Sequence, residues 1–188
     1  EKNPFANRDP RLEVNVLHDG EEMYGVAIKV APLKSSGSTG IAQHGDATAT
    51  GYSQQKWLDP SIDPQSAGWE MGKDWVTIRY AEVLLIYAEA LNELNGQYDI
   101  PSWDGNKTHI IKRDINEMKK GIRPIRIRAG VPDYTQEEYD DPIEFRKKLK
   151  RERQIELFAE GHRFFDIRRW CDCLLYTSPS PRDGATSR

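Results

Sequence analysis

The sequence predicts a mainly α-helical fold with an irregular, loop-rich lobe that contains a short β-hairpin. Apolar residues recur at three- and four-residue steps over about residues 76–94, which is the period of an amphipathic helix. A second helix is predicted to begin at Asp141-Pro-Ile-Glu144, where an N-cap acceptor precedes a proline and an acidic residue follows three positions after the N-cap. Up to about Lys73, in contrast, Gly, Pro, Ser and Asp interrupt the apolar runs, as they do in loops.

The amino-terminal lobe contains one stretch with the alternation of a β-strand. Apolar and polar residues alternate along Leu12–Leu17, and His18-Asp19-Gly20 follows as a turn. We therefore expect a hairpin whose second strand is Tyr24–Val30. Asp9 followed by Pro10 is a helix-start pattern, so a single helical turn is expected before the first strand.

The first helix is predicted over about residues 76–94. Val83 and Ile86 give this helix a second apolar face, outside its main stripe. Gly96 is expected to close the helix in a left-handed conformation. The main stripe is expected to face the core and consists of Tyr80, Leu84, Tyr87, Ala88, Leu91 and Leu94.

Three further helices are predicted in the second half of the chain. One runs from Thr108 through Met118, and Pro124 must end or kink it because proline removes a hydrogen-bond donor. The next begins at the N-cap and proline described above and covers Asp141–Phe158. A short last helix is predicted over Arg163–Trp170.

The segment from Arg151 to Trp170 combines many charges with many aromatic rings. Charged residues that are buried with apolar neighbours must be paired. Five apolar side chains are expected to be buried, namely Phe158, Phe164, Phe165, Ile167 and Trp170. Glu152, Glu156 and Glu160 follow at four-residue steps, so we expect ion pairs between the last two helices. The arginines expected to supply them are Arg151, Arg153, Arg163, Arg168 and Arg169.

Composition and charge limit the classes of function. The 188 residues carry a net charge of −3, with 27 basic and 30 acidic side chains, so no nucleic-acid partner is expected. No apolar run approaches the roughly 20 residues of a membrane-spanning helix. The sequence opens at Glu1 without an initiator Met or an apolar signal region, and we expect the chain to be part of a longer protein.

The carboxy-terminal residues differ in character from the rest. Residues 171–188 lack periodicity and are rich in Ser, Pro and Gly. From Cys173 onward the sequence resembles a translated sequencing adapter, so we interpret this tail as non-native or disordered. Cys171 and Cys173 are too close for an unstrained disulfide, and no redox role is inferred. The predicted division is a loop-rich lobe over 1–75, a helical region over 76–170, and the tail.

No catalytic residue, metal site or cofactor is predicted. The four histidines form no His-x-x-x-His pair, and the chain has no phosphate-binding Gly-rich loop and no nucleophile elbow. Paired carboxylates for glycoside hydrolysis stay open, although structural ion pairs are the commoner cause of such clusters. His162 could act as a general base, but packing is favoured because no nucleophile accompanies it.

Three separated motifs carry a family resemblance: Arg8-Asp-Pro-Arg11, the run Arg79–Glu93, and the run Arg151–Trp170. Together they resemble the carboxy-terminal half of the SusD/RagB family, the glycan-capturing outer-membrane lipoproteins of Bacteroidetes. The resemblance implies a partial scaffold of tetratricopeptide-like helical pairs. It also implies a structural role for a set of motif residues, namely Arg8, Asp9, Arg11, Glu152, Glu156, Glu160, His162, Arg163 and Asp166.

The same resemblance implies a function and a location. The protein would be a non-enzymatic, surface-exposed lipoprotein of the outer membrane that captures oligosaccharides. Its partner would be a TonB-dependent transporter, to which it delivers the glycan. Two alternatives stay open, a tetratricopeptide-like protein-interaction module and, less favoured, a glycoside hydrolase.

Aromatic residues in loops are the candidates for glycan binding, because a flat ring can stack on the apolar face of a sugar. Trp69 and Trp103 lie in Gly- and Asp-rich loops, and Asp104 and Asn106 beside the second could bind hydroxyl groups. Another segment, Thr50-Gly-Tyr-Ser-Gln-Gln-Lys56, resembles a family segment that we interpret as a buried strand. This interpretation disfavours the two aromatic residues there, Tyr52 and Trp57.

Overall fold

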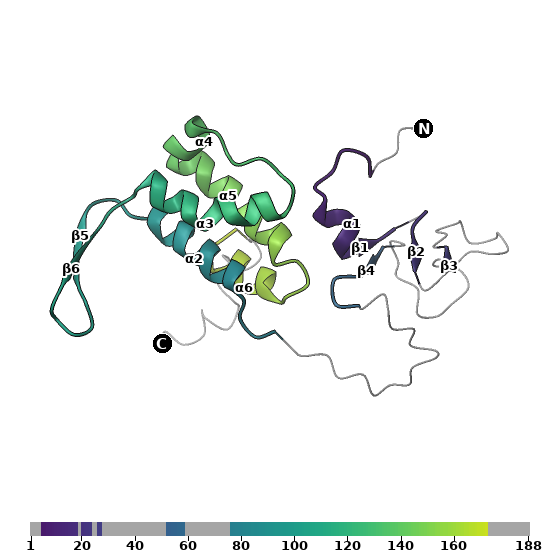
Figure 1. Cartoon of the computed structure of the whole chain (residues 1–188), viewed down its shortest axis with the longest axis horizontal. Helices are drawn as coiled ribbons and strands as arrows, with labels where there is room; N and C mark the ends of the chain where they lie inside the picture. The colour runs from purple at the N-terminus through teal and green to yellow at the C-terminus, as the bar shows by residue number, and fades with distance from the viewer. Residues whose placement is uncertain (1–4, 19, 24–25, 28–51, 59–75, 173–188) are drawn as a thin grey trace, which may run out of the picture.

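The computed structural model describes five ranges of the chain, 5–18, 20–23, 26–27, 52–58 and 76–172. Within them lie six α-helices and three two-stranded antiparallel sheets (Figure 1). The mainly helical fold is therefore confirmed. Trp69 and the tail from Cys173 lie outside the described residues.

The helices are α1 (Arg11–Asn15), α2 (Tyr80–Asn92), α3 (Ile115–Arg128), α4 (Gln136–Asp140), α5 (Pro142–Glu156) and α6 (His162–Arg169). The strand pairs are β1 (Val16–Leu17) with β4 (Ser53–Gln54), β2 (Glu22–Met23) with β3 (Val26–Ala27), and β5 (Tyr98–Pro101) with β6 (Thr108–Ile111). The predicted boundaries between a lobe over 1–75, a helical region over 76–170 and a tail stay predictions.

Helices α2 and α3 form an antiparallel pair. Arg113, just before α3, donates to the side chain of Asn92 at the end of α2. Further along both helices, a Cβ atom at Gly121 would lie 2.6 Å from the Leu84 carbonyl oxygen and 2.9 Å from Ala88 Cβ. Only glycine fits such a close approach, so this residue sets the distance between the two helices.

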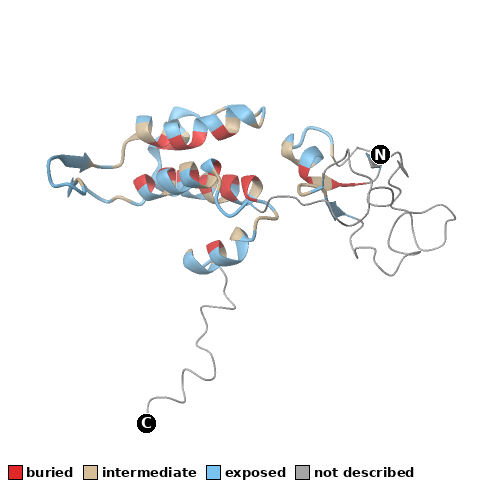
Figure 2. Cartoon of the chain, turned by 60° about the horizontal axis from the view of Figure 1, so that its bottom comes forward, coloured by how far each residue is buried: buried red, intermediate tan, exposed pale blue. Residues whose placement is uncertain are grey.

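The core is formed by one face of each long helix (Figure 2). Tyr139 of α4 stacks on Phe145 of α5 with ring centroids 4.9 Å apart, which closes the core at one end. The remaining buried apolar residues come from α2, α3 and α5 and from the residue after α5, namely Ala81, Leu85, Ala88, Leu91, Met118, Ile122, Ile125, Leu149 and Leu157.

The buried stripe of α2 is shifted from the predicted one. Ala88 and Leu91 are buried as predicted, but Leu85 is fully buried in place of Leu84, and Tyr80 and Tyr87 are 75% and 40% exposed. Helix α2 packs against both α3 and α5, and this double contact centres the buried face on Leu85. A tyrosine at the edge keeps its hydroxyl in water, which makes its exposure inexpensive.

The start of α5 follows the predicted pattern. Asp141 is the N-cap residue, and its carboxylate accepts from the backbone N–H groups of Ile143 and Glu144 at 2.8 and 3.1 Å. Pro142 occupies the first turn, where the absence of its N–H leaves no partner unsatisfied. The short last helix, α6, is confirmed over nearly the predicted range.

The predicted strand over Leu12–Leu17 is wrong in its first part. Residues Arg11–Asn15 form α1, because the Asp9 carboxylate and carbonyl accept from the N–H groups of Arg11 and Leu12 and so start a helical turn. The strand that follows, β1, pairs with β4, whereas Val26–Ala27, the described part of the predicted second strand, pairs with β2. Strands β2 and β3 form a separate short hairpin.

The helix start predicted at Thr108 is also wrong. Thr108–Ile111 forms the strand β6, whose residues Thr108, His109 and Ile110 are exposed. Pro124 was expected to end or kink its helix; it does not end α3, which continues to Arg128, and the kink stays a prediction. The N–H that proline lacks would have bonded to the carbonyl of Lys120, and both residues are exposed, so water can serve that carbonyl.

The ends of two helices differ from expectation as well. Helix α2 is capped by Glu93, and Gly96 does not have a positive φ angle. The left-handed glycine stands instead after α3, at Gly130 with φ of 73°. Helix α4 was not predicted, although Thr135 and Glu138 form a capping box in which each side chain accepts from the other's backbone N–H.

The burial predicted for the aromatic residues near the end of the chain is wrong in part. Phe158, Phe164 and Phe165 are 39%, 47% and 68% exposed. Ile167 and Trp170 are partly buried. Helix α6 contributes a charged residue, Asp166, to the interior and leaves its phenylalanines on the outer face. Among the described helices, none is long and apolar enough to cross a membrane.

Candidate functional site

The hairpin formed by β5 and β6 projects away from the helices as an arm (Figure 1). Its strands pair Tyr98 with Ile111 and Pro101 with Thr108, so the turn at the tip contains residues 102–107. Trp103 lies in this turn and is 99% exposed. A tryptophan so fully in solvent contributes nothing to the core, and its whole ring is available to a ligand.

Hydrogen bonds fix the conformation of this turn. The Asp104 carboxylate accepts from the Ser102 hydroxyl and from the backbone and side-chain amides of Asn106, the latter two at 3.1 and 2.9 Å. The Ser102 N–H donates to the Lys107 carbonyl at 2.7 Å, and Gly105 has the positive φ that the turn requires. Hydrogen bonds from Ser102 and Asn106 also hold the pKa of Asp104 below its usual range.

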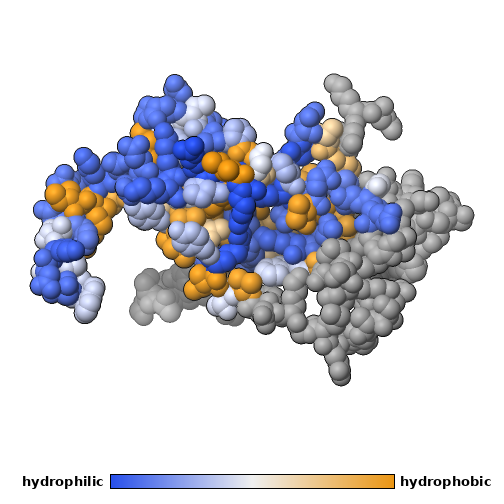
Figure 3. All heavy atoms as spheres, in the orientation of Figure 1, coloured by the Kyte–Doolittle hydropathy of each residue, from blue (hydrophilic) through white to orange (hydrophobic). Residues whose placement is uncertain are grey.

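The structure therefore places three of the four predicted ligand residues, Trp103, Asp104 and Asn106, in one turn. An indole ring stands beside an ionised carboxylate and an amide, which is a combination suited to a sugar with an apolar face and polar hydroxyls. Apolar side chains also line the arm: Figure 3 shows them among hydrophilic ones, and Ile100 and Ile110 are 47% and 64% exposed.

A cavity of about 510 Å³ lies between α1 and α5. Three aromatic rings line it, from Phe5, Tyr52 and Phe158, together with the charged side chains of Arg8 and Arg151. The interpretation of residue 52 as part of a buried strand is wrong, because Tyr52 is 47% exposed and β4 is exposed at both residues. In the sequence, only the aromatic character of Tyr52 indicated that it could line a binding site. The interpretation of its segment as a buried strand led us to disfavour it.

A network of ion pairs joins the lobe to the helices at Glu152. The side chain of this residue is only 2% exposed. It accepts from Arg11 Nη1 at 2.7 Å and from Arg126 Nη1 at 2.6 Å. The Tyr134 hydroxyl lies 3.3 Å from the same carboxylate. Every oxygen of this buried ion thus has a donor, as burial of a charge requires.

Glu156 is the second buried acid of the network, with a side chain 3% exposed. Arg11 Nη1 and Arg79 Nη1 donate to it at 2.9 and 2.6 Å, and Arg128 forms a third contact. Burial opposes its ionisation, but the hydrogen bonds from Arg128, Arg79 and Arg11 outweigh burial and lower the pKa of the carboxyl group.

Glu160 completes the network. Arg79 Nε lies 2.8 Å from its Oε2, and Lys56 donates to its Oε1. Burial raises the pKa of this carboxyl group, but the bonds from Arg79 and Lys56 outweigh it, so the pKa is lowered. Burial lowers the pKa of Lys56 in spite of this pairing. The neighbouring Trp57 donates its indole N–H to the Ala159 carbonyl at 2.9 Å, which fixes it as a packing residue.

The predicted partners of these three glutamates are wrong. We expected arginines of the same segment, yet the donors come from α1, from α3, from the start of α2 and from residue 56. The pair expected between the last two helices is formed by another acid, Asp166 of α6, which accepts from Arg153 at 2.7 Å. Arg151 and Arg163 are exposed.

His162 of α6 lies beside Glu82 of α2, with Nδ1 3.5 Å from Oε1. Arg169 of the same helix pairs with Glu89, and Trp170 donates its indole N–H to that carboxylate at 2.7 Å. These contacts attach α6 to α2.

Comparisons with known proteins agree on one family. The SusD family model matches residues 1–186. A SusD-like protein of Formosa agariphila is 25% identical over 166 residues, which cover 87% of this chain and 29% of that protein. A SusD-like carbohydrate-binding protein of Bacteroides fragilis, solved by crystallography, superposes with a TM-score of 0.64 at 30% identity. That match covers 90% of this chain and 30% of the solved chain. The chain thus spans about 30% of the length of the proteins it matches.

Proposed function

This chain belongs to the SusD family, and we propose that it is the carboxy-terminal part of a non-enzymatic glycan-binding protein of an outer-membrane nutrient-uptake system. The intact protein is a surface-exposed lipoprotein that captures oligosaccharides. It delivers them to a TonB-dependent transporter in the same membrane. The carbohydrate-binding description of the Bacteroides fragilis relative supports the ligand class.

The observation that carries the proposal is the exposure of Trp103. An indole ring 99% in solvent costs free energy unless a ligand covers it, since apolar surface in water is unfavourable. The turn that holds it is fixed by the hydrogen bonds of Asp104, so the ring is presented without a further ordering cost. Stacking of a pyranose on this ring is therefore the binding mode, with Asp104 and Asn106 available to hydroxyl groups. Trp69 is a second candidate ring.

The carboxyl groups support a binding protein over a hydrolase. A glycosidase needs one carboxylic acid with a raised pKa to protonate the leaving group. Among the described residues, each carboxyl group with a shifted pKa is shifted downward, as Glu156 and Glu160 are by their arginine and lysine partners. Such carboxyl groups stay ionised at neutral pH and form ion pairs that stabilise the fold.

A protein-interaction module is the second candidate, and one observation favours it. Helix α2 has a second apolar face on which Val83 and Ile86 are 47% and 48% exposed. An apolar helix face of this kind can take a partner helix. The two candidates make different predictions, since a module of that type binds protein and has no affinity for sugars.

The test is a binding assay on the complete protein with a panel of neutral and acidic oligosaccharides. Saturable binding to at least one class of glycan, with no release of reducing sugar, is the expected result. Co-purification with a TonB-dependent transporter encoded beside the gene tests the partner. Protein partners without any glycan affinity would favour the interaction module, and turnover of the sugar would favour a hydrolase.

A further inference from the structure

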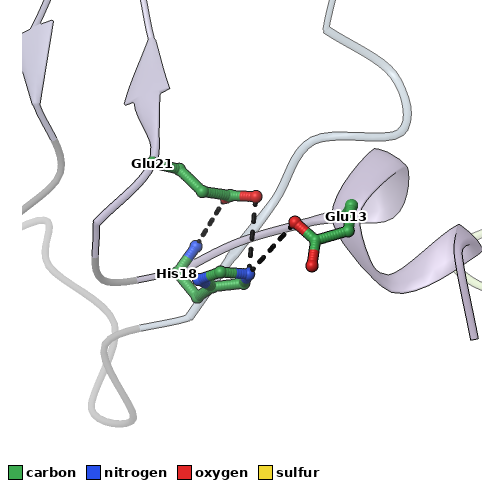
Figure 4. Close-up of side chains that lie close together, drawn as sticks. All are labelled: Glu13, His18 and Glu21. Carbon is green, nitrogen blue, oxygen red and sulfur yellow. Dashed lines mark hydrogen bonds and ion pairs between the residues drawn. The ribbon is translucent and has the colours of Figure 1, made fainter. Parts of the chain in front are cut away.

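Glu13, His18 and Glu21 come together where α1, β1 and β2 meet, and they form a cluster of a different chemical kind from the arginine-rich network (Figure 4). One imidazole nitrogen and one oxygen from each carboxylate lie within 4.8 Å of one another. The sequence alone predicted no metal site, because these three residues follow no metal-binding motif. We propose that Glu13, His18 and Glu21 bind a Zn²⁺ ion.

Two of the three separations between the ligand atoms fit a small cation. His18 Nε2 lies 3.4 Å from Glu21 Oε1 and 3.7 Å from Glu13 Oε2. Two ligands at the usual Zn²⁺ distances of about 2.0–2.2 Å stand about 3.3–3.6 Å apart in a tetrahedral site. The two measured separations exceed the range of about 2.7–3.2 Å for an N–H···O hydrogen bond. They match the edges of a coordination tetrahedron more closely.

Neighbouring groups hold the imidazole in place. The Phe5 ring stacks on the His18 ring with centroids 3.7 Å apart and an angle of 5° between the planes. The histidine is only 6% exposed, and Figure 4 shows its Nε2 directed toward both carboxylates. A ring fixed by packing loses little freedom when a metal binds, which favours affinity.

The carboxylate of Glu21 is also oriented in advance. Its Oε2 accepts from the backbone N–H of His18 at 2.9 Å, which leaves Oε1 toward the imidazole. The turn that returns Glu21 to this position depends on Gly20, whose φ is 92°, and on a 3.3 Å bond from the Glu21 N–H to the His18 carbonyl. Glu13 is 56% exposed on its side chain, so the ion can enter from solvent and keep water as a fourth ligand.

The donor set selects among divalent cations. An imidazole and two carboxylates suit Zn²⁺, whereas Ca²⁺ takes six to eight oxygen ligands and seldom accepts nitrogen. Since the three ligands come from α1 and from both sides of the turn after β1, the bound ion would join these short elements. It acts as a structural link in the lobe.

The test is calorimetric titration of the chelator-treated complete protein with ZnCl₂, with CaCl₂ as the comparison. We expect one Zn²⁺ per chain, and at least tenfold weaker binding in His18→Ala and in Glu21→Gln. His109→Ala is the matched control, because this exposed histidine of β6 lies outside the cluster, and it should bind as the parent does. Substituted Co²⁺ should give visible absorption that His18→Ala loses.

Because His18 is buried, its replacement could unfold the lobe, so the exposed Glu13 supplies an independent variant. Glu13→Gln should fold normally and bind Zn²⁺ at least tenfold more weakly. Unchanged Zn²⁺ affinity in Glu13→Gln, no saturable Zn²⁺ binding by the parent, or equal affinity for Ca²⁺ would each overturn the proposal.

Discussion

Arg11 in α1 lies 2.7 Å from Glu152 in α5, measured from Nη1 to Oε1, although 141 positions separate the two residues in the sequence. The same guanidinium also bonds Asp9 and Glu156. One arginine therefore closes the turn of the first motif and attaches that turn to the helix of the last motif. The charged motif residues act as the joint between the lobe and the helices.

The first prediction concerns the strength of this joint. Replacement of Glu156 by Ala removes a buried acid that Arg11 and Arg79 share, and leaves Arg11 with Glu152 and Arg79 with Glu160 only. We expect a loss of about 3 kcal/mol in the free energy of unfolding. The control is Glu93→Ala. The side chains of Glu93 and its partner Arg146 are each 44% exposed, so this ion pair is worth under about 1 kcal/mol. Equal melting temperatures of the two variants in the complete protein would contradict the expectation.

The second prediction concerns acid. Glu156 and Glu160 have pKa values below the unfolded value of 4.5, so their contribution is complete above about pH 4.5 and is lost as pH falls through the folded pKa. We expect stability against urea to fall between about pH 5 and about pH 3. In Glu156→Gln this fall should be shallower. An identical acid dependence in variant and parent would show that this group does not control it.

The third prediction tests the contact between α2 and α3. Gly121→Ala adds a methyl group 2.6 Å from the Leu84 carbonyl oxygen, so the helices must separate. The gain in helix propensity of about 1 kcal/mol is smaller than the cost of overpacking, and a net loss of about 1–3 kcal/mol is expected. Gly96→Ala is the matched control, because nothing lies within 4 Å of its Cβ position. A stabilised Gly121→Ala protein would refute the close contact.

Local signals in the sequence were sufficient for the long helices. The N-cap at Asp141 and the spacing of apolar residues in α2 depend on neighbours a few residues away. Both segments are helices, as predicted. The exact buried face was not predictable from α2 alone. It depends on contacts with α3 and α5, which the sequence of one helix does not contain.

The remaining errors have one local and one long-range cause. The alternation of Leu12–Leu17 suits a strand as well as a short helix, and the local hydrogen bonds that Asp9 accepts from Arg11 and Leu12 favour the helix. The partners of Glu156 lie at positions 11, 79 and 128, and no periodic pattern links those arginines to it. The candidate ligand residues Trp103, Asp104 and Asn106 lie close together in the sequence, so this group could be identified without knowledge of the fold.

The fourth prediction concerns the exposed face of α2. Val83 and Ile86 are about half exposed in the described structure, and patches of this kind promote association. Residues 1–170 made alone should bind a hydrophobic dye or aggregate. Val83→Glu together with Ile86→Glu should reduce dye binding. A monodisperse monomer with a sharp melt and no dye binding would show that this face needs no cover.

The last prediction concerns glycan capture by the complete protein. Because Trp103 is 99% exposed, Trp103→Ala should leave the melting temperature unchanged. If sugars stack on its ring, oligosaccharide affinity should fall 10- to 100-fold, about 1.4 to 2.8 kcal/mol, and Trp69→Ala is the second variant to measure. Trp57→Ala is the opposite control, since loss of its bond to Ala159 should lower stability.

His162→Ala separates this binding mode from catalysis. The imidazole of His162 on α6 lies against Glu82 of α2, far along the chain from the arm. Its loss should therefore leave glycan affinity unchanged and act only through stability. No variant should alter the release of reducing sugar, because none is expected from the parent. Unchanged affinity in both Trp103→Ala and Trp69→Ala would place the glycan site outside this chain, while turnover abolished by one Glu or His substitution would replace capture with hydrolysis.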